Sequence, residues 1–383
     1  MGINLIRLLT LIIITIYFFG CEDNSSYKGY KVVLLNLFKT SYLWSDRVDS
    51  DIDLSNIYSP EQMVEELKYR PKDRWSFIVS KEQNRKILSQ SGVGFGFAYK
   101  IIDGNFTILY TRTNSPAYVS GLKRGDIVLD IDGKNPLDVD LLSLIDLNKS
   151  INFRVFRENT LLDISIMPSR YDFNVSDSKV VKDNIGYFRL DSFGLDVVDE
   201  INRSFDFFKS QNIKDLIVDL RYNSGGLVVV ASIFLDKLVT NFDNEVQFRL
   251  KWNNNYKKRD YIYRFESDEN SLNLDRIVFL TTNTTASASE VVINALKPYL
   301  NVITIGDRTY GKPVGMEGIE DRKYIYYLVN FKIENSLGIS DYFDGLAPTC
   351  KEIDDLNYSL GDIREAMLNS AIYFIENGSC RGD

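Results

Sequence analysis

The stretch DLIVDLRYNSGG, residues 215–226, decides the fold class of this 383-residue chain. Its first six residues are mainly apolar and predict a short buried strand, the paired glycines predict a tight turn, and the apolar run at 227–239 predicts a helix. The same alternation predicts strands at 185–190, 277–281 and 302–305, helices at 197–209 and 287–296, and a final amphipathic helix at 360–377. Strands that alternate with helices are typical of an α/β domain, which we place at residues 172–383.

Two regions with different sequence patterns precede this domain. Residues 31–90 carry apolar side chains near helical spacing, and Ser59-Pro60-Glu61 is a typical helix start, so we expect a small helical N-terminal domain. Residues 91–168 consist of short strands and tight turns. The run GLKRGDIVLDIDG, residues 121–133, resembles the PDZ fold, with a glycine turn followed by a strand and an Asp-Gly hairpin. The chain is therefore expected to be a multi-domain α/β protein.

The composition excludes several kinds of chemistry. The chain contains no histidine, which removes Ser-His-Asp and Cys-His catalysis and histidine-ligated zinc. Three cysteines cannot fill a four-thiolate zinc site, so we expect no metal site of that kind. The net charge of -8, without any basic block, argues against nucleic acid as a partner. A hydrolase built from this chain must use Lys, Asp, Glu or Tyr as its base, or a metal held by carboxylates.

The N-terminus predicts export. Arg7 precedes twelve almost purely apolar residues at 8–19, and FFGC at 18–21 resembles a bacterial lipobox, in which the cysteine is lipidated and becomes the mature N-terminus. We expect a signal peptide at 1–20, a lipid on Cys21 and a polar tether at 21–30. An uncleaved anchor with an incidental cysteine is the alternative.

The other two cysteines, Cys350 and Cys380, are left as a pair. An exported location permits a disulfide between them, and two buried free thiols are the alternative.

Three motifs carry candidate chemistry, and the first is TASASE at residues 285–290. Ser287 and Glu290 fit a capping box, in which the serine caps the helix and the glutamate reaches back to it. The same serine also stands beside free N–H groups at a helix start. In that setting Ser287 can act as a nucleophile, with the N–H of Ala288 stabilising an oxyanion.

The second and third motifs have ordinary interpretations too. Gly225 and Gly226 can aim an N–H at a ligand, or they can form a plain strand-to-helix turn. The segment GDRTYGKP at 306–313 has P-loop spacing, but Pro313 replaces the Ser or Thr that would hold magnesium. Lys312 alone would be interpreted as a solvated loop lysine.

Taken together, these motifs resemble those of the C-terminal processing proteases, which are Ser-Lys peptidases with a PDZ domain ahead of a crotonase/ClpP-like catalytic domain. The matching segments are GYFRL at 186–190, DLRYNSGG at 219–226, ASASE at 286–290 and Gly-Lys at 311–312, with YLW at 42–44 and DRWS at 73–76 in the N-terminal part.

The resemblance implies a role for each residue. Ser287 would be the nucleophile, Lys312 the base, and Ala288 with Gly225 or Gly226 the oxyanion donors, without any cofactor. A lysine accepts a proton only when its amine is neutral, so Lys312 must lie in a dry pocket that lowers its pKa.

One position departs from the family pattern. Many relatives place a glutamine four residues after the lysine, where it holds the amine, and this chain has Met316 there. A thioether does not donate a hydrogen bond and accepts only weakly. Either another group orients Lys312, for which Thr309 is a candidate on sequence distance, or activity is reduced.

The PDZ-like region also contains a candidate peptide site. Val93, Gly94, Phe95, Gly96 and Phe97 resemble the carboxylate-binding loop of that fold, in which N–H groups receive a terminal carboxylate while the peptide adds as a strand. The two phenylalanines would line a pocket for an apolar last residue. Plain core packing is the alternative, and it applies to at least one of them because strand side chains alternate between faces.

These observations predict a lipid-anchored serine endopeptidase of the bacterial cell envelope, on the periplasmic or cell-surface side. Its substrates would be proteins with apolar C-terminal tails, and its membrane contact would be the N-terminal lipid. The rival hypothesis is a catalytically weak lipoprotein that uses the PDZ-like region to bind peptides as a scaffold.

Overall fold

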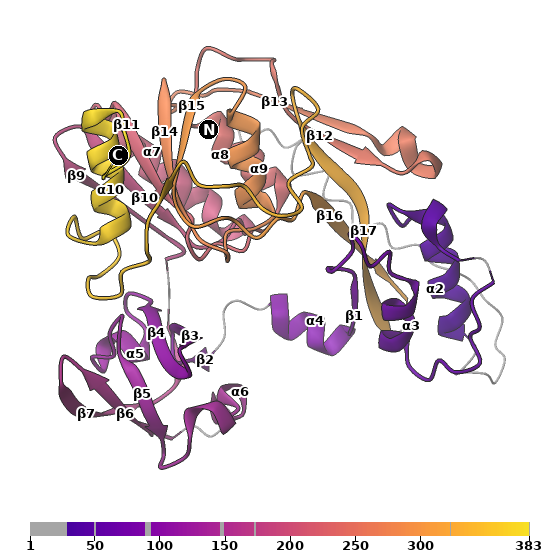
Figure 1. Cartoon of the computed structure of the whole chain (residues 1–383), viewed down its shortest axis with the longest axis horizontal. Helices are drawn as coiled ribbons and strands as arrows, with labels where there is room; N and C mark the ends of the chain where they lie inside the picture. Colours follow the sequence, from indigo (N-terminus) through magenta and orange to yellow (C-terminus); the bar gives the residue numbers. More distant parts are fainter. Residues whose placement is uncertain are drawn as a thin grey trace.

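The structure is a computed structural model that describes residues 29–49, 51–88, 93–145, 149–171, 174–321 and 323–382. The expected signal peptide, lipidation site at Cys21 and most of the tether lie outside the described residues. Figure 1 shows three parts: an N-terminal domain, a β-rich module below, and a larger α/β domain above. We call residues 93–170 the β module.

The α/β domain is built on a six-stranded sheet in the order β18-β15-β14-β11-β10-β9, parallel except for the β9–β10 pair. Its strands are β9 (Ser176–Lys182), β10 (Ile185–Leu190), β11 (Asp215–Asp219), β14 (Arg276–Thr281), β15 (Asn301–Gly306) and β18 (Cys350–Lys351). Its helices are α7 (Val198–Ser210), α8 (Val228–Asp236), α9 (Ala288–Leu296) and α10 (Ala366–Asn377), with a short 3-10 helix at Leu195–Val197.

The helices cover both faces of this sheet because strand side chains alternate between faces. Phe188, Leu216 and Val218 pack with α7, α8 and α9, whereas Tyr187 and Ile217 pack with α10 on the opposite face. The α/β layering predicted from the sequence is therefore present. The last helix begins at Ala366 rather than at residue 360, because the buried Glu365 caps it by accepting hydrogen bonds from the N–H groups of Met367 and Leu368.

A second sheet joins the α/β domain to the N-terminal domain. Its order is β1-β17-β12-β13, with β16 also paired to β17. The strands are β1 (Phe77–Ser80), β12 (Val246–Trp252), β13 (Tyr261–Arg264), β16 (Val314–Glu320) and β17 (Tyr324–Asn335), and a 3-10 helix at Asn254–Arg259 connects β12 and β13. The twelve-residue β17 thus runs from the α/β domain into the N-terminal domain.

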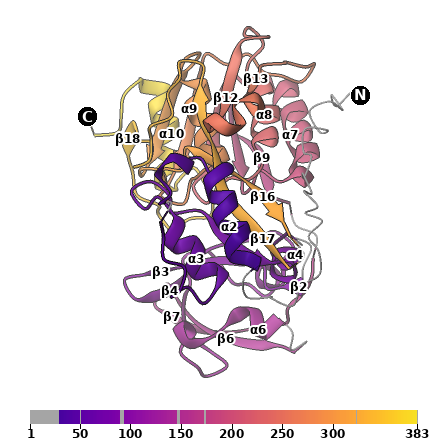
Figure 2. The ribbon, with the colours of Figure 1, turned by 90° about the vertical axis from the view of Figure 1, so that its right-hand side faces the viewer.

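The N-terminal domain contains α2 (Gly29–Thr40), a 3-10 turn at Ser45–Arg47, α3 (Pro60–Leu67) and α4 (Lys81–Leu88). The expectation of a purely helical region at 31–90 missed β1. This apolar run completes the sheet edge beside β17, with register Ile78 to Tyr326. Figure 2 shows α2 and α3 beside β17, and the buried side chains of both helices share one cluster with Tyr326, Leu328 and Val329.

The β module has its own core and a five-stranded antiparallel sheet in the order β3-β4-β5-β6-β7. Its elements are β2 (Val93–Gly94), β3 (Phe97–Ile102), β4 (Asn105–Thr111), α5 (Pro116–Val119), β5 (Ile127–Ile131), a 3-10 turn at Pro136–Asp138, α6 (Leu141–Ile145), β6 (Ile151–Arg157), β7 (Thr160–Ile166) and β8 (Ser169–Arg170). The short β2–β8 pair closes the module where the chain enters and leaves it.

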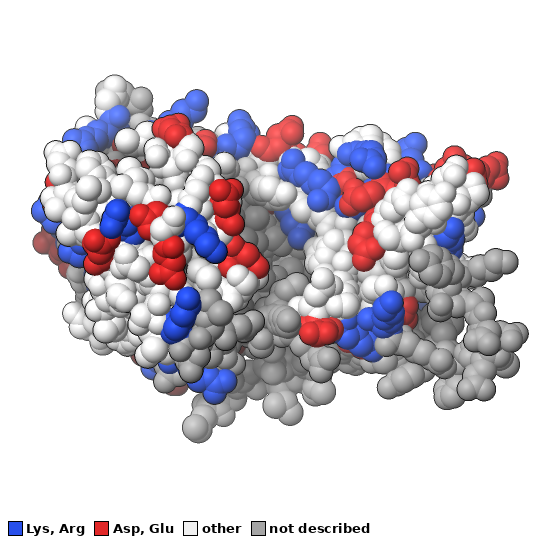
Figure 3. Space-filling view, turned by 90° about the horizontal axis from the view of Figure 1, so that it is seen from below, with Lys and Arg blue, Asp and Glu red and all other residues white. Residues whose placement is uncertain are grey.

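Charged side chains of both signs mix on the face seen in Figure 3 instead of gathering into one patch. Within the β module, Arg154 pairs with both Asp163 and Asp130. Within the described ranges, no helix is long and apolar enough to cross a bilayer, and no cluster of three acidic or cysteine side chains forms a metal-binding group. Cys350 and Cys380 form a disulfide that ties the segment after α10 to β18.

Candidate active site

Ser287 lies at the turn between β14 and α9, in a strained backbone conformation. Its φ of 55° and ψ of -118° place a non-glycine residue in a region that L-residues rarely adopt. Such strain recurs where a strand-to-helix turn presents a nucleophilic serine. The half-buried side chain stands at the positive end of α9, a nine-residue helix buried along its whole length.

The carboxylate of Glu290 organises the surrounding loops. One of its oxygens, Oε2, accepts hydrogen bonds from the N–H groups of Ser287 at 2.9 Å and Lys312 at 2.7 Å. The other, Oε1, accepts from the Gly311 N–H at 2.7 Å and the Thr309 hydroxyl at 2.5 Å. The glutamate of the expected capping box does reach back to Ser287, and it also fixes the loop that carries Lys312. A single buried side chain therefore holds two candidate catalytic residues side by side.

Burial dominates the electrostatics of this carboxylate. It raises the pKa of Glu290 above its ordinary value, although the four donors act in the opposite direction. The side chain is fully shielded from solvent. Its hydrogen bonds are consequently made in a medium of low polarity, where they are strong and costly to lose.

Lys312 has the environment that a general base requires. Burial lowers the pKa of its amine to about 8, against the opposing charges of Asp73 and Glu290. A substantial fraction of the amine is then neutral near physiological pH. In the described parts of the chain, no hydrogen bond joins this amine to the Ser287 hydroxyl. Such contacts commonly tighten only when substrate binds.

The glycine turn lies directly against Ser287. A Cβ added to Gly225 would lie 2.7 Å from the Cβ of Ser287 and 3.0 Å from the N of Ala288, so only glycine fits there. The Gly225 N–H, however, already donates to Oδ1 of Asn223 at 2.8 Å. No hydrogen bond within the described residues occupies the N–H of Ala288 or of Gly226. Of the two glycines named from the sequence, Gly226 is thus the one with an N–H to offer.

Asn223 joins the two turns, a role that sequence reasoning missed. Its carbonyl accepts hydrogen bonds from the Ala286 N–H at 3.1 Å and the Ser289 hydroxyl at 3.0 Å. Its side-chain amide donates to the carbonyl of Leu190 at 2.9 Å. The asparagine in the turn at 219–226 could have indicated this role, because a buried asparagine needs several hydrogen-bond partners.

A buried ion network supports the start of the same turn. Arg221 is 1% exposed, and its guanidinium pairs with Asp219, Glu365 and Asp354. Asp354 also pairs with Arg124 of the β module. The pKa of Asp354 lies below its usual value because the two arginines outweigh the effect of burial.

Arg124 connects the β module to this network. It donates to Asp354 at 2.6 Å, to the Tyr222 hydroxyl at 2.5 Å and to the carbonyls of Tyr358 and Asp355 at 3.0 Å. Tyr222 in turn stacks on Tyr110 of the β module, with ring centroids 5.4 Å apart. The glycine turn is therefore in direct contact with the docked module.

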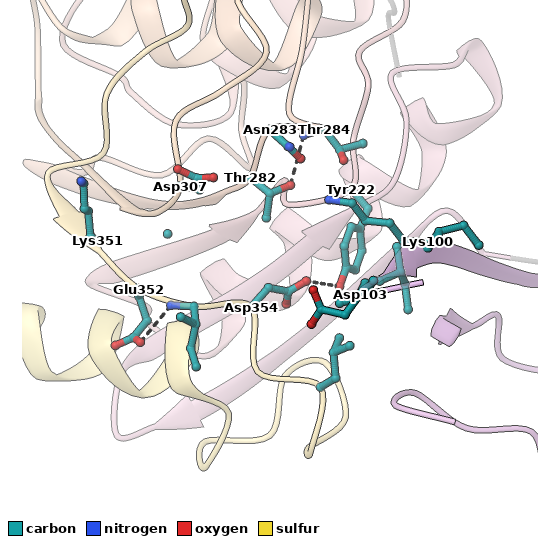
Figure 4. Close-up of a pocket in the computed structure, with 16 residues that line it drawn as sticks. Lys100, Asp103, Tyr222, Thr282, Asn283, Thr284, Asp307, Lys351, Glu352 and Asp354 are labelled. Atoms are coloured by element: carbon teal, nitrogen blue, oxygen red, sulfur yellow. Dashed lines mark hydrogen bonds between the residues drawn. The ribbon is translucent and has the colours of Figure 1, made fainter. Parts of the chain in front are cut away.

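Two cavities of about 740 and 540 Å³ lie between the β module and the α/β domain. Both are lined by Lys100 of β3 and by Tyr222. Figure 4 shows the larger one, where the Tyr222 hydroxyl donates to Asp354. Neither cavity is lined by Ser287 or Lys312. The smaller one nevertheless reaches Arg74 of the N-terminal domain and Thr309 and Tyr310 of the loop at 307–313 that carries Lys312, which we call the lysine loop.

The structure shows where Met316 and Thr309, the two residues discussed in connection with the Lys312 amine, lie. Met316 lies in β16 and packs against the cluster shared with the N-terminal domain. The Thr309 hydroxyl donates to Glu290 and accepts from the N–H of Leu346, so Thr309 fixes the loop and does not bond to the amine. Thr309 therefore acts on the loop through Glu290, and no hydrogen bond within the described residues joins its hydroxyl to the Lys312 amine.

The predicted peptide loop is mainly structural in its described part. Val93 and Gly94 pair with β8, and Gly96 has the positive φ of 81° that favours glycine. Phe95 is 5% exposed and packs on Phe153, whose ring centroid lies 5.5 Å away. The half-buried Phe97 also packs against this core. Within the described residues, neither cavity is lined by residues 93–97.

Comparison with known proteins gives a consistent answer. Residues 184–330 match the family profile "Peptidase family S41", and residues 34–77 match "Peptidase S41 N-terminal domain". The carboxy-terminal processing protease CtpB of Bacillus subtilis is 24% identical over 253 residues, which cover 63% of this chain and 51% of that protein. Carboxyl-terminal-processing peptidase 3 of Arabidopsis thaliana chloroplasts is 25% identical over 346 residues, covering 81% of this chain and 62% of that one.

Among solved structures, an S41-type protein of Bacteroides fragilis shares the fold with a TM-score of 0.75 at 23% identity, covering 95% of this chain and 100% of that one. The photosystem II D1 C-terminal processing protease gives a TM-score of 0.56 at 18% identity, covering 86% and 94%. The chain spans about half the length of the bacterial curated relatives it matches.

Proposed function

Because the chain carries both domains of peptidase family S41, a serine-type peptidase family, we propose that it is an endopeptidase with Ser287 as nucleophile and Lys312 as general base. The observation that carries the proposal is the carboxylate of Glu290, one oxygen of which accepts from the backbones of both residues. Residues 25 positions apart in the sequence thus share a single anchor. A pKa of about 8 supplies the neutral amine that the base requires.

In the proposed reaction, the Lys312 amine takes the proton of the Ser287 hydroxyl as its oxygen attacks the substrate carbonyl carbon. The N–H groups of Ala288 and Gly226 donate to the oxyanion that forms. Collapse of this intermediate breaks the peptide C–N bond, and the lysine ammonium returns its proton to the leaving amine. Water then attacks the acyl-enzyme with the same lysine as base, which releases the acid product and restores Ser287.

We propose further that the β module is a PDZ-like domain that holds the C-terminal tail of a protein substrate. β3 is an edge strand of its sheet, so an extended peptide can add to it through backbone hydrogen bonds. The smaller cavity links Lys100 of β3 with Tyr310 in the lysine loop, a path along which the peptide can approach the site. Since Phe95 belongs to the core, an apolar tail residue would meet Phe97 rather than both rings.

The proposed location is the bacterial cell envelope, with a lipid on Cys21. The apolar run before Cys21 and the polar segment after it support this, and the disulfide between Cys350 and Cys380 is compatible with an oxidising compartment. A cysteine-to-serine change at residue 21 should leave the protein unlipidated, as judged by mass spectrometry of the membrane fraction.

The direct test is active-site labelling and peptide turnover. The wild-type protein should react with a fluorophosphonate probe and cleave unstructured protein substrates, and Ser287→Ala and Lys312→Ala should each abolish turnover while keeping a folded circular-dichroism spectrum. Lys214→Ala and Ser210→Ala, on exposed residues that line neither cavity, serve as matched controls. If the wild type neither labels nor turns over substrate, the endopeptidase is excluded. A tail-binding scaffold, for which Met316 is the supporting feature, would then be the remaining function.

A further inference from the structure

The N-terminal domain reaches the active site through the segment Asp73–Ser76, which lies between α3 and β1. This segment is more than 230 residues away from the lysine loop in the sequence, yet it contacts that loop directly. The contact matters because Glu290, the acceptor on α9, binds the N–H groups of Gly311 and Lys312 and the Thr309 hydroxyl but none of the loop's carbonyls.

Arg74 supplies contacts to carbonyls of the loop. Its Nη2 donates to the carbonyls of Tyr310 at 3.0 Å, Gly311 at 3.2 Å and Phe343 at 2.9 Å. Its guanidinium also lies over the ring of Tyr310, 4.9 Å from the centroid, and over that of Trp75 at 5.1 Å. One planar group thus fixes the two residues that immediately precede Lys312.

Asp73 places a negative charge near the same lysine. Its buried carboxylate accepts from the Tyr42 hydroxyl at 2.7 Å and from the N–H groups of Trp75 at 2.9 Å and Ser76 at 3.0 Å. These bonds hold the carboxylate rigidly. The charged groups that act on the Lys312 amine are Asp73, from the N-terminal domain, and Glu290, from α9.

We propose that Arg74 and Asp73 are positioning residues for the base, so that the N-terminal domain completes the active site. Arg74 fixes the loop, and Asp73 holds the turn that carries Arg74 and adds a negative charge on the side of the N-terminal domain. The expected effect on catalysis rests on the proposed Ser-Lys function. The hydrogen bonds of Arg74 to the loop, which we call the clamp, are a property of the fold. Separation of the N-terminal domain from the loop would then displace Lys312, while Ser287 would keep its position.

Arg74→Ala and Arg74→Lys test the clamp, with Arg70→Ala as matched control. Arg70 is an exposed arginine of the same domain that donates to the carbonyl of Glu65 in α3 and, among the residues that the structure describes, makes no contact with the lysine loop. Hydrogen exchange of the backbone at 307–313 should accelerate at least about tenfold in Arg74→Ala and less in Arg74→Lys, because an ammonium lacks the planar fork. Arg70→Ala should match the wild type.

Kinetics on the full chain test the positioning role. Arg74→Ala should lower kcat at saturating substrate about ten- to a hundredfold, because the lysine is displaced. Arg74 also lines the smaller cavity, so the fall in kcat and not the value of KM reports on positioning. Asp73→Asn should keep the fold and shift the acid limb of the kcat/KM profile to lower pH. The reason is that a nearby negative charge favours the ammonium, and its removal lowers the pKa of Lys312.

Each outcome decides between distinct claims. Unchanged exchange at 307–313 in Arg74→Ala overturns the clamp, whatever the activity. Faster exchange with unchanged kcat, or an unshifted acid limb in Asp73→Asn, overturns the positioning role. A wild type without turnover or probe labelling overturns the proposed peptidase function instead, and the exchange experiment still tests whether the N-terminal domain holds the loop.

Discussion

Replacement of Glu290 by glutamine should separate the two halves of the candidate site. The carboxylate offers two acceptor oxygens, and each receives two donors. An amide keeps one oxygen and presents an NH2 group in place of the other. If the NH2 takes the place of Oε2, the N–H groups of Ser287 and Lys312 both lose their acceptor. If it takes the place of Oε1, only the Gly311 N–H does, because the Thr309 hydroxyl can turn and accept.

The cost follows from this count. A hydrogen bond to a charged group contributes about 1.5–3 kcal/mol, so one or two losses amount to about 1.5–6 kcal/mol. Removing a buried charge offsets part of this cost, since burial already raises the pKa of Glu290. We therefore expect the free energy of unfolding to fall by about 2–4 kcal/mol, a large part of the stability of a typical domain. Turnover should fall at least about a hundredfold because Ser287 and Lys312 lose their shared anchor.

Urea unfolding followed by tryptophan fluorescence gives the first quantity, and peptide turnover of the folded variant gives the second. Glu376→Gln is the matched control. Glu376 is an exposed glutamate on α10 that pairs with Lys182, and its change should stay within about 0.5 kcal/mol. A Glu290→Gln protein with the stability and turnover of the wild type would refute the view that this carboxylate organises the site.

Three further predictions concern other parts of the site. The pH profile of kcat/KM should rise about tenfold per pH unit on its acid side and level off near pH 8. The reason is that Lys312, whose pKa is lowered to about 8, acts only as the neutral amine. Activity that is flat from pH 5 to 9 would exclude Lys312 as the base. Gly225→Ala should lose at least about a hundredfold in turnover, since its Cβ would lie 2.8 Å from a backbone oxygen. Gly338→Ala, at a similar positive φ but with open space around it, should lose only stability, so equal activity losses in both variants would argue against a steric cause. Arg124→Ala should destabilise docking of the β module by about 1–3 kcal/mol, because Asp354 loses one of its two arginines. Limited proteolysis of the connection that follows the β module should then accelerate, and an unchanged cleavage rate would contradict this.

The sequence predicted the α/β domain because its signals are local. Residues 215–239 contain a strand, a turn and a helix in succession, each with its own pattern, and tertiary contacts did not override them. Ser287, Gly225 and Lys312 could be named as candidates for the same reason, as each belongs to a short motif in a fixed order, and the structure brings their turns together.

The parts that were missed depend on distant contacts. β1 is a four-residue run whose pairing partner, β17, lies about 250 residues later, and no local pattern announces that pairing. Glu290 was identified as a helix-capping residue, but its bonds to the loop at 309–312 depend on how β15 ends beside α9. The engagement of the Gly225 N–H by Asn223 is likewise a matter of side-chain rotamer.

The long strand β17 limits how this protein can be divided. One end shares the buried cluster of α2 and α3, and the other pairs with β12, so a gene that lost the codons for 29–88 would encode a hairpin with Tyr326, Leu328 and Val329 facing water. Such a fragment should be recovered as inclusion bodies. By the same reasoning, exchange of the N-terminal domain between lineages requires that residues 314–335 be inherited with it.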